Sequence, residues 1–212
     1  DEQILGPFPI GFDFEFYCDT YSQFYISDNG FITFSDGQNI STWDVRPTPD
    51  ATLPNHLIAI AWADYFPDNG TIKYFVTGVP PNRKLVINYQ NIEHIGGLGA
   101  PLNGQLVLYE GDSVEVHITS MTTDNTPHLL GVENRDGTVG TAAPGKNGTS
   151  NWSAANAGFR FTQNTLPANL AYEWRIAPMP GVVGTGPTLT QAPSDTITYQ
   201  VRRSEEHTSE LQ

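Results

Sequence analysis

Apolar and polar residues alternate with a period of two along most of the chain. In the segment from Ile10 to Phe16, the aromatic residues Phe12, Phe14 and Phe16 would face one way, and acidic residues separate them. Successive side chains of a strand point to opposite faces of a sheet, so this alternation predicts a strand with one buried face.

Two further segments predict how such strands connect and where the sheet is most deeply buried. Asp28-Asn29-Gly30 separates two short apolar runs, and Asn-Gly favours a type I′ hairpin turn, in which both central residues have positive φ. Leu57–Trp62 is continuously apolar, which is typical of a central strand covered on both faces.

The remaining strand signals are short and regularly spaced, with Gly, Pro and Asn clusters between them. No window follows the 3.6-residue period of a helix, and there is no room for the crossover helices of a parallel sheet. The sequence therefore predicts an all-β, antiparallel β-sandwich of jelly-roll type. The further predicted strands are residues 24–26, 31–34, 71–76, 84–89, 106–109, 113–119, 129–133, 159–161 and 171–176.

Composition predicts where this sandwich ends. We expect it to span residues 1–176 and to be followed by a Pro- and Gly-rich linker at 177–187. Residues 188–202 resemble the truncated first strand of an immunoglobulin-like module. Residues 203–212 resemble translated sequencing-adapter sequence and are expected to be an artefact. We therefore expect the chain to be a fragment of a longer protein.

The charge of the chain excludes several partners. The formal net charge is −13, and the only lysines are Lys73, Lys84 and Lys146. Nucleic acids and anionic membrane surfaces require clustered basic residues, so we expect neither as a partner. No run of 18 consecutive apolar residues occurs in the chain, so we expect no membrane insertion.

Cys18 is the single cysteine, which precludes a disulfide within the chain, and we expect it to be a half-buried apolar residue.

The residues that usually carry catalysis show no local signature. His56, His94, His117 and His128 are scattered, and the chain has neither a Gly-x-Ser-x-Gly elbow nor a His-Glu-x-x-His or paired-cysteine zinc motif. Paired carboxylates could serve a glycosidase, but the sequence cannot select a pair among so many acidic residues. We therefore predict a protein that is not an enzyme and needs no cofactor.

Two pairs of residues are candidates for binding. Asp64 and Asp68 could offer oxygen ligands to calcium, although they lack the spacing of a calcium loop, and Asp68 begins a sequence that favours a simple turn. Trp43 and Trp152 lie in polar, loop-like sequence and could stack on sugars. The alternative is that each ring closes an end of the sandwich.

Five short motifs, taken in order, resemble those of nidogen-like extracellular domains in bacterial secreted and surface proteins. Nidogen-like domains usually carry Asn-Thr-Phe-Gln where this chain has Asn103-Gly104-Gln105, a departure that separates it more from animal nidogens than from bacterial relatives. The motifs are the hairpin at 25–34, the Trp–Asp strand at 60–64 with the following strand at 70–74, the arginine-led strand at 81–89, the hairpin at 104–117 and the turn at 131–137.

The resemblance implies a non-catalytic β-sandwich module of a larger extracellular or cell-surface protein. Its implied role is adhesion or the presentation of neighbouring domains, with an extracellular protein or glycan as ligand. Two alternatives remain open: a carbohydrate-binding module using Trp43 and Trp152, and an appended domain of a secreted hydrolase.

Overall fold

The computed structural model is built almost entirely of antiparallel strands. It describes residues 2–34, 42–162, 170–177, 181–185, 188–193 and 195–205. The chain divides into two compact units, residues 1–163 and 164–212, each of which is described by itself.

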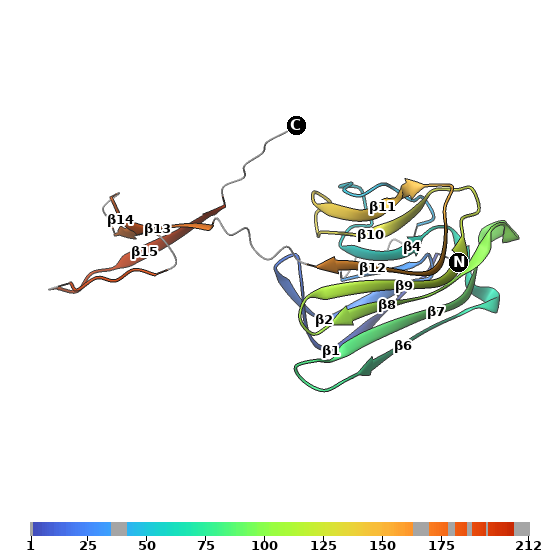
Figure 1. Cartoon of the computed structure of the whole chain (residues 1–212), viewed down its shortest axis with the longest axis horizontal. Coiled ribbons are helices and arrows are strands. Elements are labelled where there is room, and N and C mark those ends of the chain that lie inside the picture. The colour runs from blue at the N-terminus through green and yellow to red at the C-terminus, as the bar shows by residue number, and fades with distance from the viewer. Residues whose placement is uncertain are drawn as a thin grey trace. The chain divides into compact units, whose positions relative to one another are not determined.

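Two sheets of six strands form the first unit, and they stack as the two layers of a β-sandwich (Figure 1). One sheet has the order β1 (Ile4–Phe16), β2 (Asp19–Ser27), β3 (Phe31–Thr33), β4 (Leu57–Trp62), β10 (His128–Glu133) and β11 (Gly140–Thr149). The other has the order β12 (Ser153–Thr162), β9 (Ser113–Thr122), β8 (Ala100–Tyr109), β7 (Lys84–His94) and β5 (Tyr65–Phe66), with β6 (Thr71–Thr77) also paired to β7. The predicted antiparallel β-sandwich is therefore confirmed.

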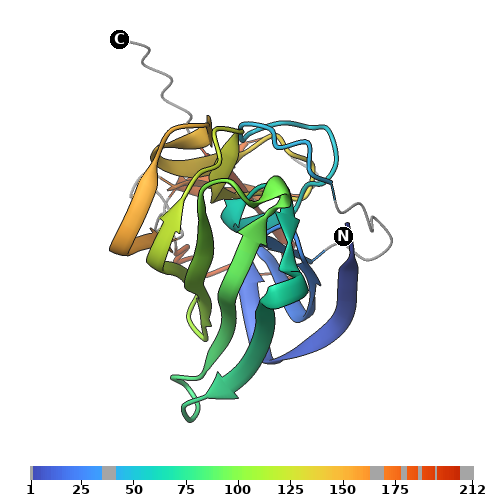
Figure 2. The same ribbon diagram turned by 90° about the vertical axis from the view of Figure 1, so that its right-hand side faces the viewer.

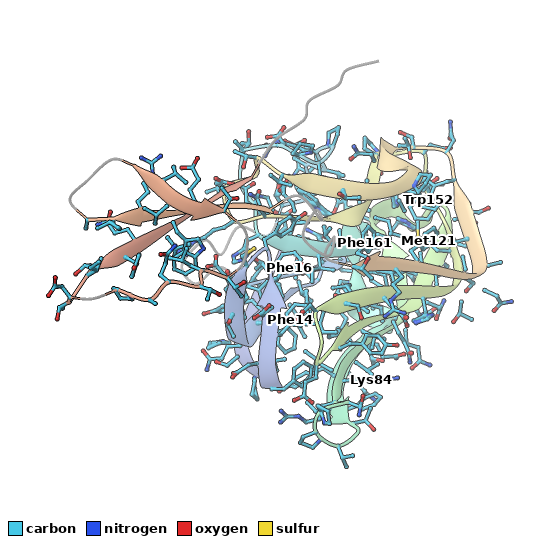
Figure 3. All side chains as sticks on the ribbon, turned by 60° about the vertical axis from the view of Figure 1, so that its left-hand side comes forward. Phe14, Phe16, Lys84, Met121, Trp152 and Phe161 are labelled. Carbon is cyan, nitrogen blue, oxygen red and sulfur yellow. The ribbon has the colours of Figure 1, made fainter. Side chains whose placement is uncertain are left out.

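The alternation at the start of the chain has the predicted consequence. Phe12, Phe14 and Phe16 are at most 6% exposed, whereas Asp13 and Glu15 are exposed. Phe14 and Phe16 lie on β1 (Figure 3), and their rings contact Phe34. The inward faces of the two sheets together form one apolar core. It includes Ile58 and Ile60 from the first sheet and Leu85, Ile87, Leu106, Leu108, Val114, Val116 and Ile118 from the second.

The hairpin at Asp28-Asn29-Gly30 forms between β2 and β3, but its turn differs from the expectation. Ser27 pairs with Phe31, which leaves a three-residue loop, and positive φ occurs at Gly30 but not at Asn29. Such a loop is the common alternative to a type I′ turn. Asn29 is fully buried, and its Oδ1 accepts a hydrogen bond from the Tyr65 backbone, so tertiary contacts determine this turn.

A turn with two positive φ values occurs instead between β1 and β2. Phe16 pairs with Asp19, and the two residues between them, Tyr17 and Cys18, have φ values of 50° and 67°. Cys18 is exposed, so the expectation of a half-buried cysteine is wrong. A residue at the tip of a tight hairpin projects beyond both sheets, which is why its side chain reaches solvent.

The apolar run of β4 is buried on both faces, as predicted. One face contributes to the core between the sheets, and the other forms a smaller cluster outside the first sheet. Trp62 anchors that cluster, since its indole nitrogen donates to the Thr42 carbonyl at 2.8 Å. The cluster consists of Phe31, Leu57, Ala59, Trp62 and Leu129, with Ile4, Val45 and Ala142 packed against it.

Several elements have no counterpart in the apolar pattern. The strands β5 and β11 were not predicted, and neither were two single-turn 3-10 helices, η1 (Pro67–Asn69) and η2 (Ile95–Gly97). β11 lies at a sheet edge and is rich in glycine and polar residues, so it has no apolar alternation to detect.

Figure 2 shows that the hairpin between β6 and β7 extends past its neighbouring strands. Within the described residues, no helix is long and apolar enough to cross a membrane.

The second unit contains β13 (Leu170–Ile176), β14 (Val182–Thr185) and β15 (Tyr199–Glu205). β13 was expected to complete the sandwich, but it pairs with β14 and β15. Part of the predicted linker forms β14, and residues 206–212 of the adapter-like segment lie outside the described residues. The first compact unit thus ends before the predicted boundary at residue 176.

We expect Phe14→Ala to lower the free energy of unfolding by about 3–5 kcal/mol, because it removes a fully buried ring and leaves a cavity. Phe75→Ala is the matched control, since Phe75 is 50% exposed, and it should cost less than about 1 kcal/mol. Urea unfolding followed by tryptophan fluorescence measures both. Equal losses in the two variants would contradict the assignment of Phe14 to the core.

Candidate functional site

The two tryptophans predicted as a sugar-binding pair lie in different environments. Trp43 is 58% exposed. Trp152 is partly buried against the core, and the Lys146 ammonium lies 4.1 Å from the centre of its ring. Trp152 thus resembles the expected plug at an end of the sandwich, while Trp43 offers an exposed ring.

The two aspartates predicted as calcium ligands also occupy separate features. Asp64 follows β4 and is partly buried; burial and the nearby charges of Asp124 and Asp28 raise the pKa of its carboxyl group. Asp68 lies in η1 and is exposed. In the described residues, neither belongs to a group of three potential metal-binding side chains. Calcium binding there stays a prediction.

A groove lies between β1 and β6, which are edge strands of the two sheets. Its volume is about 550 Å³, and Asp28 and Asp68 are its acidic residues. The β1 and β6 edges meet at Gly11, where an added Cβ would lie 3.0 Å from the Val76 side chain. The groove is lined by Gln3, Leu5, Phe8, Ile26, Asp28, Phe66, Pro67, Asp68, Ile72 and Tyr74.

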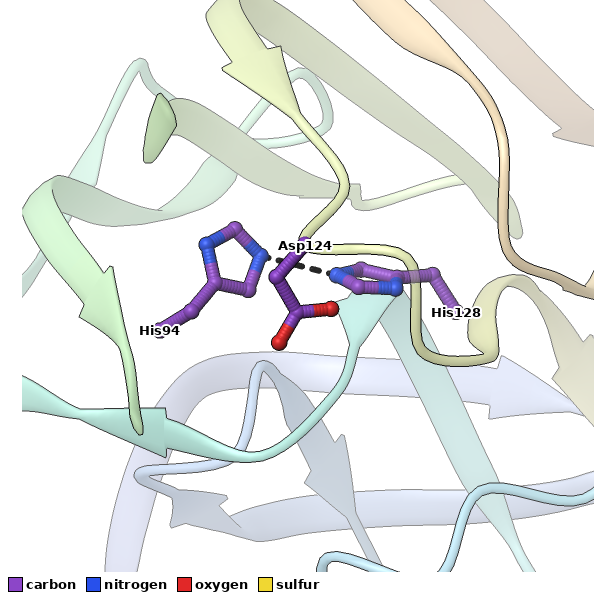
Figure 4. A group of neighbouring side chains, drawn as sticks. All are labelled: His94, Asp124 and His128. Atoms are coloured by element: carbon purple, nitrogen blue, oxygen red, sulfur yellow. Dashed lines mark hydrogen bonds between the residues drawn. The ribbon is translucent and has the colours of Figure 1, made fainter. Parts of the chain in front are cut away.

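The most concentrated chemistry of the described residues is a buried cluster of His94, Asp124 and His128 (Figure 4). His94 is the last residue of β7, Asp124 follows β9, and His128 begins β10. The three side chains are 2%, 6% and 0% exposed, and their potential ligand atoms lie within 4.8 Å of one another. We name this group the histidine cluster.

Hydrogen bonds within the chain orient two members of the histidine cluster. Nδ1 of His128 lies 2.9 Å from the Thr126 carbonyl oxygen, which can only accept, so this nitrogen carries a proton. Asp124 Oδ1 accepts from the backbone nitrogen of Thr126 at 2.9 Å and from its hydroxyl at 2.6 Å. The short connection between β9 and β10 therefore holds both side chains in place.

The two imidazole rings approach each other edge to edge. Nε2 of His94 lies 2.8 Å from Nε2 of His128, and the black dashed line in Figure 4 marks this contact. Nδ1 of His94 is buried without a hydrogen bond of normal geometry, although the Leu98 backbone lies near enough to raise the pKa of the ring. Aromatic rings enclose the pair, with Tyr65 against His94 and Trp152 against His128.

Burial and hydrogen bonding together determine the charge of the histidine cluster at neutral pH. Loss of hydration, followed by the proximity of His128, lowers the pKa of His94 to about 4, and burial also lowers the pKa of His128. Burial tends to raise the pKa of Asp124, but hydrogen bonds from the hydroxyl and backbone of Thr126, together with the electrostatic influence of His94 and His128, outweigh it and lower the pKa. The cluster therefore combines two neutral imidazoles with one carboxylate.

Sequence reasoning missed this cluster because its histidines are 34 residues apart and lie on strands of different sheets. Its one local signal is the spacing Asp124-x-Thr126-x-His128, in which the threonine bonds to the aspartate and to the second histidine. Nothing in the spacing shows that His94 would join them.

Comparison with known proteins identifies the family. A family model described as NIDO related, that is nidogen-related, matches residues 1–175. The chain therefore belongs to the nidogen-related family, which confirms the resemblance seen in its strand motifs and indicates an extracellular module. No curated protein and no solved structure matches the chain.

A further buried histidine, His56, lies apart from the histidine cluster. It is 2% exposed, and it packs against the rings of Phe16, Tyr21 and Phe34. Burial, aided by the positive charge of Arg135 and opposed by Asp19, lowers its pKa to about 4. At neutral pH the folded protein therefore holds this imidazole uncharged.

We expect His56 to make the domain less stable in acid. Below pH 6.5, His56 takes up a proton in the unfolded chain but resists it in the folded chain until about pH 4, so stability falls as the pH decreases through this range. At pH 5, His56 should lower the free energy of unfolding by about 1–2 kcal/mol relative to its value at pH 7.5. Urea unfolding of the wild type and His56→Gln at both pH values measures it; an identical pH dependence of the two proteins would contradict the assignment.

Proposed function

We propose that this domain is a non-catalytic module of an extracellular protein, and that it binds an extended segment of a partner protein in the groove between β1 and β6. Such binding would serve adhesion or the presentation of neighbouring domains. The groove is the observation that carries the proposal, and family membership supports the extracellular setting.

The groove offers apolar surface that the fold does not use. Leu5 is 58% exposed and Phe66 is 39% exposed, although both are large apolar residues. The rings of Phe8 and Tyr74 also line the groove, and they pack against each other with their centres 5.0 Å apart. Contiguous exposed apolar surface with a polar rim is typical of a protein-binding site.

The strand edges and the charge indicate what kind of segment would fit. β1 and β6 each pair with one neighbouring strand in the described part of the chain. An extended peptide can therefore lie along them and form backbone hydrogen bonds. Asp28 and Asp68 in the groove, together with the net charge of −13, favour a segment that combines apolar residues with Lys or Arg.

We expect a library of displayed random peptides, selected on the folded chain, to be enriched in sequences that combine Lys or Arg with Leu, Ile, Phe or Tyr. Leu5→Asn should weaken binding of a selected peptide by about tenfold or more, because it removes apolar contact area. Fluorescence anisotropy with the labelled peptide measures the change.

Val139→Asn is the matched control for this experiment, since Val139 is 51% exposed and does not line the groove. It should bind the peptide as the wild type does. A folded chain that enriches no peptide, or equal losses in Leu5→Asn and Val139→Asn, would refute peptide binding in the groove.

Carbohydrate binding is a second candidate, favoured by the exposed ring of Trp43. If sugars stack on that ring, a glycan array should show a ligand that Trp43→Ala loses and Trp43→Phe retains in part. Trp152→Ala should have little direct effect, because that ring packs against the core. An array without any ligand for the folded chain would argue against this candidate.

A further inference from the structure

The histidine cluster spans the two sheets of the sandwich. His94 ends β7 of the second sheet, His128 begins β10 of the first, and Asp124 lies in the connection between β9 and β10. A buried interaction among these three side chains would therefore link the sheets at one end of the core. Burying a polar side chain costs free energy unless it has a hydrogen-bond or ion partner, so each of the three side chains needs such a partner.

The hydrogen bonds within the chain leave a lone pair at the centre of the histidine cluster. Because His128 carries its proton on Nδ1, its neutral ring presents an unprotonated Nε2 to His94. If His94 donates from Nε2, its own Nδ1 is left as a buried acceptor without a regular hydrogen bond. If His94 is protonated on Nδ1, two nitrogen lone pairs face each other at 2.8 Å, an arrangement that a cation between them would stabilise.

The surroundings of the rings match those of metal-binding histidines. Such a histidine binds the metal through one ring nitrogen and usually donates the N–H of its other ring nitrogen to a backbone carbonyl or carboxylate, which fixes the ring. His128 makes this bond to Thr126, and the Leu98 backbone lies beside His94. Asp124 accepts both Thr126 hydrogen bonds on Oδ1, so the carboxylate is held in position while Oδ2 makes neither of these bonds.

The donor set identifies the class of ion. Two imidazole nitrogens and one carboxylate oxygen suit zinc and related divalent transition metals better than calcium or magnesium, which prefer oxygen ligands alone. Tetrahedral zinc with Zn–N bonds of about 2.0–2.1 Å places two nitrogens about 3.3–3.4 Å apart. The observed 2.8 Å therefore requires the rings to separate by about 0.5 Å.

We propose that His94, Asp124 and His128 bind one divalent transition-metal ion, with zinc as the expected occupant. Three protein ligands leave a fourth position for water. The ion links His94 of β7 in the second sheet to His128 of β10 in the first and thereby joins the two sheets. This site is independent of the groove and of the peptide binding proposed there.

The test uses the whole chain after treatment with a chelator and its removal. Zinc titration by calorimetry should give one site per chain, and cobalt should give the visible absorption bands of a tetrahedral complex. Zinc at about a hundredfold above its Kd should raise the Tm by about 5–10 °C, because the ion binds the folded chain and not the unfolded one.

Two substitutions and two controls assign the ligands. Asp124→Asn and His128→Gln should each weaken zinc binding by about 100-fold or more. His117→Gln should bind zinc as the wild type does, because His117 is an exposed histidine beside Glu115, outside the cluster. Leu5→Asn should also retain the metal, which separates this test from that of the groove.

Three results would overturn the proposal. One is a folded wild-type chain without saturable zinc binding and without a change in Tm. Another is binding that persists in His128→Gln but disappears in His117→Gln, since this would place zinc at the surface beside Glu115. The third is an octahedral cobalt spectrum that His128→Gln leaves unchanged. Because the wild-type titration is decisive by itself, a variant that fails to fold does not prevent a conclusion.

Discussion

The apolar interface between the two sheets is the constraint on which the rest of the sandwich depends. Strands such as β1 and β9 bury alternate side chains in it, and β4 in addition covers its other face with the smaller cluster around Trp62. Burial on this scale is the dominant favourable contribution to folding, and it requires the strands to hold their register, since a shift by one residue would turn the apolar face outward.

The groove and the histidine cluster do not follow from the alternation of apolar and polar residues, and both lie at the margins of this interface. The groove follows the open edges, where β1 and β6 have strand partners on one side in the described structure. The histidine cluster lies at the end of β7 and at the connection by which the chain passes from β9 in one sheet to β10 in the other. At strand edges and strand ends, the packing between the sheets does not require an apolar residue. Polar groups can therefore occupy these positions and form binding sites.

Local sequence predicted individual strands better than the connections between them. The bounds of β4 and the inward face of β1 follow from their residues, because a fully apolar run and a strict alternation each allow one arrangement. The turn at Asn29 was predicted wrongly, since contacts with Tyr65 outweigh the preference of Asn-Gly. The edge strand β11 escaped detection because one of its faces is not required to be apolar.

The sequence by itself determined the all-β class, the antiparallel pairing, most of the strands that form the core and the family to which the chain belongs. It did so because periodicity and strand motifs are local properties, encoded within a few consecutive residues. Only the tertiary structure decided that β1 and β6 border a groove and that His94 meets Asp124 and His128. These contacts depend on which strands lie next to one another. The arrangement of the strands follows from the packing of the whole core and is not encoded in any one segment.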